Sequence, residues 1–191
     1  MSERVADAPV QDAPPSQKPR DPLRGILAKF ATGVTILAAG RDKPQGMTAN
    51  SFTSVSLSPP LVLVCVNRSA AIHHAVLESK SFAISVLAAH QEDVARHFAD
   101  HSRPRGRREF DIVGWSPGPV TGAPLIHGTL AWIECGLVAT YDGGTHSIFL
   151  GSVLASTHGP GRDALLFYGG AFHRPALQSG TTEATPGHRP S

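Results

Sequence analysis

The sequence predicts a mainly β protein, in which an antiparallel β-barrel carries a few short helices. Apolar and β-branched runs of strand length recur along the chain, and turn sequences rich in Gly, Pro and Asp separate them. We distinguish roughly six or seven such runs but only about three short stretches with helical spacing. Strands joined by hairpin turns favour an antiparallel barrel over repeated βαβ units.

The composition bounds the size and the partners of the protein. A chain of 191 residues suits one domain with a substantial core. Charged residues make up 17% of the chain and the formal net charge is +2, so nothing indicates a nucleic-acid surface. The one basic cluster, residues 103–108, is predicted to be a mobile loop that can meet an anionic ligand at a pocket rim. No apolar stretch approaches the ~20 residues that span a bilayer.

Two polar, proline-containing ends flank the predicted domain. We expect residues 1–21 and 178–191 to be disordered tails, with one domain between them over residues 22–177. The N-terminal end lacks the apolar core of a signal peptide, which favours a cytoplasmic location. Cys65 and Cys135 lie in apolar strand patterns, so both are expected to be buried free thiols.

The first third of the chain is predicted to form one helix and three strands. Asp21 suits the N-cap of a helix over 21–30, and Pro22 suits its first position. Helical spacing gives this helix an apolar face made of Leu23, Ile26, Leu27 and Phe30. Strands are expected over 34–39, 45–51 and 61–66, and a turn over 40–44 joins the first two.

The rest of the chain alternates between predicted strands and helices. Ser69 is expected to cap a helix over 69–79, and a second helix is expected over 91–100. The strands are expected over 81–87, 127–140, 147–156 and 165–168. An Asp-Gly-Gly turn within 141–145 would join the two longest of these strands as a hairpin.

Residues 46–66 are the most informative stretch. Small and hydroxylated residues lead into the apolar run Leu61–Val66, which reads as a buried strand. Hydroxyls and accessible backbone amides fixed to a rigid strand suit a polar, oxygen-rich ligand. A Ser/Thr-rich loop before a strand is an equally good interpretation of these residues alone.

Other sites are weakly indicated. His73 and His74 are adjacent, so a helix directs them about 100° apart, whereas His97 and His101 have a metal-compatible spacing without an obvious third ligand. We therefore expect surface histidines and no metal. The sequence contains no Gly-x-Ser-x-Gly, Gly-x-Gly-x-x-Gly or phosphate-loop motif. His146 follows a tight turn at the start of a strand. Its side chain either lies over the mouth of a pocket or is exposed at the turn.

Several blocks in order resemble the short-chain flavin reductase family. They are Phe30–Thr35, Gly46–Val64, Phe82–Leu87, Phe98–Ala99, His146–Gly151 and Leu166–Tyr168, and together they span about residues 23–174. The resemblance implies a split, Greek-key β-barrel that forms a homodimer. It also implies that NADH or NADPH reduces FMN or FAD, and that the reduced flavin is released to a partner monooxygenase.

The resemblance also implies positions for the ligands. The segment 48–50 would lie along the isoalloxazine ring, 54–56 would border the flavin, and 67–69 with 80–82 would lie toward the ribityl phosphate. His146 would position the nicotinamide rather than act as a base, because hydride passes directly from nicotinamide C4 to flavin N5. Phe172 would lie near the same mouth, although Ala171 stands where the family often has Arg or Lys. Together these expectations give the flavin-binding candidates Met47, Thr48, Ala49, Asn50, Ser51, Ser54, Val55, Ser56, Asn67, Arg68, Ser69, Lys80, Ser81, Phe82, His146 and Phe172.

The function expected from the sequence is therefore an NAD(P)H:flavin oxidoreductase, with FAD and NADH favoured over FMN and NADPH. Arg68 and the Ser69 hydroxyl at a helix start suit a phosphate group. One alternative is a flavin-binding module without reductase activity, such as a carrier or sensor. Another is an oxidase that retains its flavin, but no acidic or basic dyad suggests a site for its chemistry.

Overall fold

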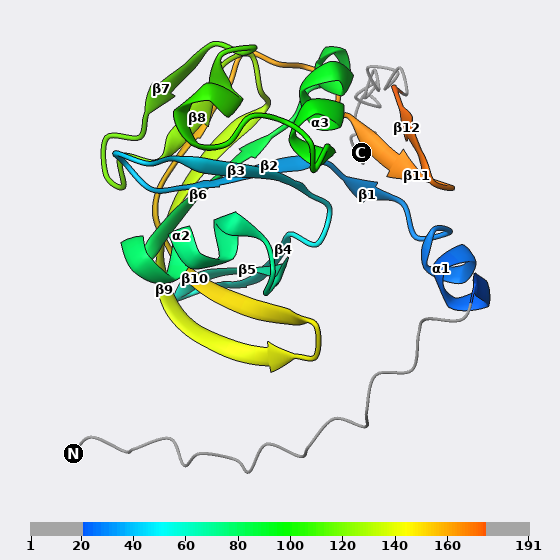
Figure 1. Cartoon of the computed structure of the whole chain (residues 1–191), viewed down its shortest axis with the longest axis horizontal. Helices are drawn as coiled ribbons and strands as arrows, with labels where there is room; N and C mark the ends of the chain where they lie inside the picture. Colours follow the sequence, from blue (N-terminus) through cyan, green and yellow to red (C-terminus); the bar gives the residue numbers. More distant parts are fainter. Residues whose placement is uncertain (1–20, 175–191) are drawn as a thin grey trace, which may run out of the picture.

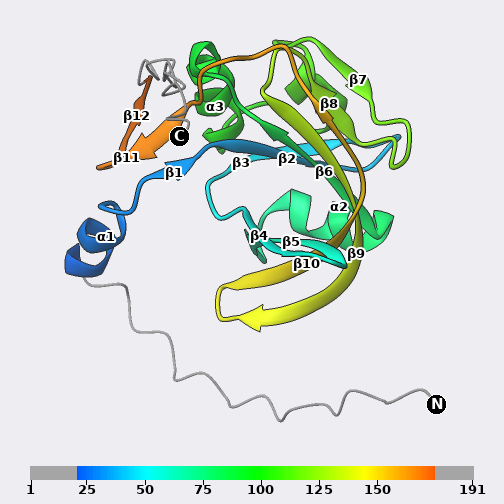
Figure 2. The same ribbon diagram turned by 180° about the vertical axis from the view of Figure 1, so that it is seen from behind.

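The computed structural model describes residues 21–174, and this part of the chain is mainly β with few helices (Figures 1 and 2). The predicted tails, apart from Asp21, and residues 175–177 of the predicted domain lie outside the described residues. The helices are α1 (Asp21–Leu27), α2 (Ala71–Ser79), α3 (Glu92–Ala99) and the 3-10 helices η1 (Ala89–Gln91) and η2 (Gly106–Phe110). The strands are β1 (Thr32–Gly33), β2 (Thr35–Ala39), β3 (Gln45–Ala49), β4 (Thr53–Leu57), β5 (Pro60–Asn67), β6 (Ser81–Val86), β7 (Trp115–Pro117), β8 (Pro124–Ile126), β9 (Ala131–Gly143), β10 (His146–His158), β11 (Leu166–Tyr168) and β12 (Ala171–His173).

A seven-stranded sheet with the order β3-β2-β6-β9-β10-β5-β4 forms the body of the molecule. Every strand pair in this sheet is antiparallel, which confirms the predicted antiparallel pairing. The hairpin of β9 and β10 provides the two longest strands, and two register shifts bend it. Smaller sheets with the orders β1-β11-β12 and β7-β8 complete the described part.

Strand β2 lies between two hydrophobic clusters, and all five of its residues are buried. Because successive side chains point to opposite faces, Leu37 enters one cluster while Ile36 enters the other. Helix α2 contributes Ile72 and Val76 to the first cluster, and α3 contributes Phe98 to the second. Figure 1 shows α2 and α3 on opposite sides of the β2–β3 hairpin. Strand β3 therefore runs between the two helices.

The expected strand boundaries need three corrections. Residues 53–57, interpreted as part of a polar loop, form the edge strand β4, which pairs with β5. The strand expected over 127–140 starts later, at Ala131, because Pro124–Ile126 forms the separate strand β8. Residues 171–173, assigned to no element, form β12 opposite β11. Apolar periodicity located the strand within 127–140 but not its ends, and it did not detect β4 or β12.

The predicted cap of α2 is wrong. Ala70 is the N-cap and makes no side-chain cap hydrogen bond. The backbone N–H and the hydroxyl of Ser69 both donate to Asn67 Oδ1, at 2.9 and 2.8 Å. Asn67 thus forms a local turn that competes with capping by Ser69. The first amides of α2 therefore have no side-chain partner within the described residues.

Helix α1 is confirmed over Asp21–Leu27, but its apolar face does not enter the core of this chain. The exposed fractions are 52% for Leu23, 66% for Ile26 and 63% for Leu27, and Phe30, after the helix, is 77% exposed. A cluster of large exposed apolar side chains at one end of a molecule is typical of an interaction surface.

The basic cluster is not the wholly mobile loop that its composition suggests. Arg103 is buried and its Nε donates to Glu109 Oε2 at 2.9 Å, while Glu109 Oε1 accepts from the Gly46 backbone N–H at 2.9 Å. Arg103 Nη1 donates to Asp100 O at 2.6 Å and Nη2 donates to Gly46 O. Burial raises the pKa of Glu109, while the Arg103 guanidinium acts in the opposite direction. These contacts tie the segment after α3 to β3.

Both cysteines are free thiols and Cys135 is completely buried, but Cys65, also expected to be buried, is only half-buried. Burial, with a smaller contribution from Glu134, raises the pKa of Cys135 to about 12. The surface assignment fails for His73, which is only 8% exposed. In residues 21–174, no three His, Cys, Asp or Glu side chains are grouped closely enough to hold a metal ion. No helix among the same residues is long and apolar enough to span a membrane.

We predict that Gly151→Ala destabilises the protein by about 1–3 kcal/mol, because a Cβ there would lie 2.5 Å from the buried Phe82 ring. Gly136→Ala is the matched control on the neighbouring strand, since the nearest atom to its Cβ would be 3.5 Å away. Urea unfolding of both variants measures the difference. Equal unfolding midpoints would contradict the tight contact with Phe82.

Candidate functional site

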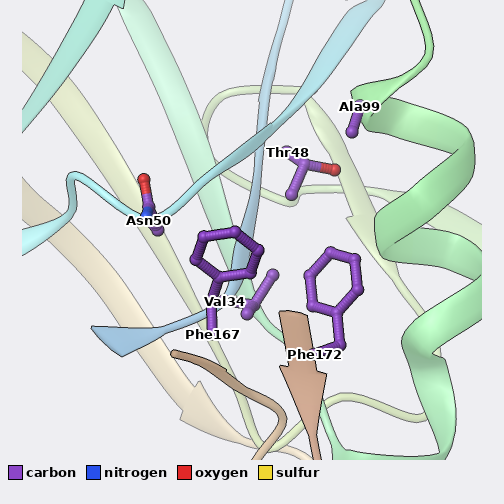
Figure 3. Close-up of a pocket in the computed structure, with 6 residues that line it drawn as sticks. All are labelled: Val34, Thr48, Asn50, Ala99, Phe167 and Phe172. Atoms are coloured by element: carbon purple, nitrogen blue, oxygen red, sulfur yellow. The ribbon is translucent and has the colours of Figure 1, made fainter. Parts of the chain in front are cut away.

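Two adjoining pockets share Thr48 and Ala99 in their walls. The first, here called the aromatic pocket, has a volume of about 180 Å³ and is lined by Val34, Thr48, Asn50, Ala99, Phe167 and Phe172 (Figure 3). The second, here called the cationic pocket, has a volume of about 260 Å³ and is lined by Gly46, Met47, Thr48, Asn67, Ser69, Ala70, Ala71, Ile72, Phe98, Ala99, His101, Arg103 and Arg105. Thr48, near the end of β3, and Ala99, at the end of α3, line both pockets, so the two pockets meet there.

The sheet β1-β11-β12 builds the flat wall of the aromatic pocket. Phe167 pairs with Thr32 on one side and with Phe172 on the other, so both Phe rings come to the same place. The ring centroids of Phe167 and Phe172 are 5.4 Å apart at 63°. In Figure 3 the two rings lie side by side with Thr48 and Ala99 above them. This wall suits a planar, largely apolar ligand.

Helix α3 and β12 are held together beside this wall. The Arg96 guanidinium lies over the Phe172 ring, 5.1 Å from its centroid. Glu92 accepts from Arg96 at 2.6 Å and from Arg174 at 3.0 Å, and these partners, Arg96 first, lower the pKa of the Glu92 carboxyl. One carboxylate thus connects the helix to the chain after β12. The contact is exposed, so it contributes orientation more than stability.

Strand β3 presents polar groups to both pockets. The Thr48 hydroxyl donates to Ala95 O at 2.6 Å, so it fastens β3 to α3 and keeps only its lone pairs for a ligand. Ala49 points the other way and is buried in the core. The Asn50 side chain forms no hydrogen bond with any described residue and borders the aromatic pocket, so its amide is available to a ligand.

The cationic pocket combines positive charge with a helix start. His101, Arg103 and Arg105 line one side, and residues 70–72 at the start of α2 line another. Gly46 allows the Phe98 ring to pack directly on β3, because a Cβ there would lie 2.7 Å from that ring. The guanidinium of Arg105 donates to His101 O at 3.1 Å, which keeps it near the rim. Cations beside uncapped helix amides suit a phosphate group.

The structure brings together six of the residues expected at the site. Met47, Thr48, Asn50, Asn67, Ser69 and Phe172 all line one pocket or both. Arg68 was expected to face the phosphate, but its guanidinium instead meets Asp142 at 2.8 Å and it lines neither pocket. The hydrogen bond of Gly144 N–H and the Arg68 charge lower the pKa of Asp142, so this partner stays ionised near neutral pH.

The other candidates lie outside the two pockets. The Ser51 hydroxyl donates to Cys65 O at 2.9 Å and accepts from Cys65 N–H at 3.1 Å, so it joins two segments of the fold. Residues 54–56 lie on the edge strand β4, where Val55 is exposed. Lys80 ends α2 with a φ of 53°, and Ser81 and Phe82 begin β6, where the Phe82 side chain is completely buried.

His146 starts β10 next to the rim of the cationic pocket. It pairs in register with Asn67, which lines that pocket, and with Gly143 across the hairpin. Its Nδ1 is 2.9 Å from the Thr145 hydroxyl. His146 lines neither pocket within the described chain, so the structure places it beside the site rather than in it.

Sequence reasoning missed part of each wall. Val34, Ala99 and Phe167 line the aromatic pocket, and all three fall within blocks that carried the family resemblance without being chosen as site residues. Arg103 and Arg105 belong to the basic cluster that was expected to reach a pocket rim, and the structure places both at the cationic pocket. The residues 70–72 gave no signal, because only the fold turns the start of α2 toward β3.

Comparisons with known proteins agree on one family. Residues 27–176 match the model described as flavin reductase like domain. An "NADH-dependent FAD reductase" of Streptomyces globisporus is 52% identical over 166 residues, which cover 85% of this chain and 91% of the relative.

Two solved structures extend this agreement to the fold. BorF, the flavin reductase component of a bacterial two-component tryptophan halogenase, is 54% identical with a TM-score of 0.77, covering 80% of this chain and 96% of BorF. The NADH:FAD oxidoreductase SgcE6 of Streptomyces globisporus C-1027, solved with NAD and FAD fragments, is 51% identical with a TM-score of 0.79, covering 85% of this chain and 96% of SgcE6. The chain therefore belongs to the flavin reductase-like domain family.

Proposed function

We propose that this protein is an NADH-dependent flavin reductase that reduces FAD, or FMN, and supplies the reduced flavin to a separate monooxygenase-type partner. The observation that carries the proposal is the junction of the aromatic and cationic pockets at Thr48 and Ala99. A flavin has the same two parts, a flat ring system and a phosphate-bearing chain. The names of the Streptomyces globisporus relative and of BorF support the reaction and the partnership.

The residues present fit a flavin. Phe167 and Phe172 would hold the isoalloxazine ring, and the Asn50 amide would bond its polar edge. Strand β3 is an edge strand of the seven-stranded sheet, so backbone groups on its open edge would be available to the ligand. A flavin held here would supply the hydride acceptor for the nicotinamide, and these residues would orient its ring.

For the phosphate, the proposal moves from Arg68 to the cationic pocket. Arg105 would supply charge, His101 a ring nitrogen, and residues 69–71 backbone and hydroxyl donors. Arg103 has a different part, because Glu109, Asp100 and Gly46 already engage its guanidinium. Arg103 fixes the wall of the cationic pocket, and the Glu109 carboxylate largely balances its positive charge.

His146 keeps its proposed role in positioning the nicotinamide. It lies beside Asn67 at the rim, so a nicotinamide stacked against the flavin from that side would meet it. The other candidates outside the pockets, residues 54–56 and 80–82, stay proposals for contacts with more distant parts of the ligands.

We further propose that the seven-stranded sheet curls into a split, Greek-key barrel and that the protein is a homodimer. The dimer proposal rests on exposed apolar side chains, which need a covering surface. They include Leu23, Ile26, Leu27, Phe30, Leu57 and Tyr168. The proposed location is the cytoplasm, where NADH is available and the free thiols of Cys65 and Cys135 stay reduced.

The first prediction concerns the reaction itself. Purified protein is expected to oxidise NADH only when FAD or FMN is added, because the proposed flavin is exchanged and not retained. Loss of NADH and flavin absorbance under anaerobic conditions measures this. Protein that holds flavin tightly and leaves it oxidised with NADH would instead support a flavin-binding module without reductase activity.

The second prediction separates Arg105 from Arg68. Arg105→Gln is expected to raise the KM for FAD and FMN by roughly 5- to 20-fold, the effect of losing one charge-assisted contact. Arg68→Gln is the matched control, with less than about a 3-fold change, because its guanidinium pairs with Asp142 outside the pocket. Steady-state kinetics at saturating NADH measure both. A larger effect of Arg68→Gln would restore the phosphate role expected from the sequence.

The third prediction concerns His146. His146→Ala is expected to raise the KM for NADH by about 10-fold while the KM for flavin changes by less than about 2-fold, as expected for a contact with the nicotinamide. Both constants come from the same kinetic series. The reverse pattern would assign His146 to the flavin.

A further inference from the structure

A buried contact between a histidine and a serine lies behind the candidate site. His73 on α2 is 8% exposed and Ser147 on β10 is 4% exposed. Their side chains meet at 2.9 Å between His73 Nε2 and Ser147 Oγ. The His73 ring also packs on Phe149, with centroids 5.1 Å apart. None of the roles proposed above uses either residue.

The contact joins α2, whose start lines the cationic pocket, to β10, which begins at His146 beside the rim of that pocket. His73 belongs to the first turn of α2, and its N–H donates to the carbonyl of Ala70, which lines the cationic pocket. Ser147 directly follows His146 on β10. A shift between α2 and β10 would therefore move His146 relative to the pocket wall.

Backbone pairing with β5 sets His146 opposite Asn67, and two contacts of Arg68 also join the β9–β10 hairpin to the pocket rim. Arg68 N–H donates to Thr145 O at 3.1 Å, and the Arg68 guanidinium meets Asp142 at 2.8 Å. Both side chains of that ion pair are about half exposed, so solvent screens it. The His73–Ser147 contact is shielded from water, so breaking it leaves a buried polar group without a partner.

We propose that His73 is a positioning residue that, through Ser147, holds the start of β10 and His146 against the rim of the cationic pocket. The inference rests on the proposed nicotinamide role of His146. This proposal adds His73, which lies on α2 outside both pockets, to the residues that set the geometry of the site.

The surroundings of His73 favour its neutral form. Its Nδ1 is buried and has no hydrogen-bond partner, so a proton added there would have no acceptor. Burial is the main cause that lowers the pKa of His73, and the neighbouring His74 and Arg68 lower it further. On β10 the groups that face the ring are uncharged, Ser147 and Phe149, while Asp142 on β9 is engaged by Arg68.

The direction of the pH effect follows from this lowered pKa. The unfolded chain binds a proton at His73 near its ordinary pKa of about 6.5, whereas the folded protein does so only at lower pH. The stability contributed by neutral His73 is therefore present above about pH 6.5 and is lost as the pH falls through the folded pKa. Below that pKa the ring is charged and the hold on β10 weakens.

The test compares His73→Gln, His73→Leu and Ser147→Ala. The Gln amide nitrogen reaches the position of His Nε2 and does not titrate, whereas Leu keeps the bulk without a hydrogen bond. At pH 8, His73→Leu and Ser147→Ala are expected to raise the KM for NADH by about 5- to 10-fold and the KM for flavin by less than about 2-fold. His73→Gln is expected to restore the KM for NADH to within about 3-fold of the wild-type value.

The pH profile supplies the second readout. As the pH falls from 8 to 5.5, the KM for NADH is expected to rise more steeply in the wild type than in His73→Gln. Over the same range, the free energy of unfolding measured in urea should fall more steeply for the wild type than for His73→Gln. His146 is present in both proteins, so only the difference between the profiles reports on His73. Ser147→Ala, which removes a single hydroxyl, carries the KM comparison if His73→Leu does not fold.

The outcomes separate this inference from the proposed function. Identical pH profiles of wild type and His73→Gln, or equal increases of both KM values in His73→Leu and Ser147→Ala, would overturn the positioning role while the reductase proposal stands. Wild-type protein that oxidises no NADH with either flavin would overturn the reductase proposal and this inference with it.

Discussion

The candidate site depends on the buried ion pair between Arg103 and Glu109. The Glu109 carboxylate accepts from the Gly46 N–H, and the Arg103 guanidinium donates to the Gly46 carbonyl. Both backbone polar groups of Gly46 on β3 are therefore held. A buried pair of charges is stable only when hydrogen bonds satisfy both, and Gly46 and Asp100 complete them here. With β3 fixed there, Thr48 and Asn50 reach their places two and four residues further on.

The same strand illustrates how polar groups divide between structure and ligand. The hydroxyls of Thr48 and Ser51 bond to backbone carbonyls of Ala95 and Cys65, which fastens β3 and its continuation to α3 and β5. The Asn50 amide has no such partner among the described residues and borders the aromatic pocket. Thr48 and Ser51 therefore use their hydroxyls to fasten the fold, whereas the Asn50 amide between them is left at the aromatic pocket.

The sequence predicted the strands and helices better than it predicted the contacts of individual side chains. Apolar runs and alternation predicted the strands 34–39, 61–66 and 81–87 closely, and helical spacing predicted two of the three helices closely, because burial imposes a pattern on the residues. The cap of α2 was missed because Asn67 competes for the Ser69 hydroxyl. Arg68, expected to face a phosphate, lines neither pocket, and its guanidinium meets Asp142, 74 positions later in the chain. No local pattern records such a partner.

The sequence by itself determined the antiparallel β architecture, the family and several residues that line the two pockets, since these follow from side-chain periodicity and from the order of the blocks that resemble the family. Tertiary structure alone decided which cations reach the site. Arg103 and Arg105 line the cationic pocket, whereas Arg68 and Arg107 do not, although all four look alike in the sequence. It also buried His73 against Ser147. Each outcome depends on contacts between residues far apart in the chain, and their burial and charge are set only when the sheet and helices pack together.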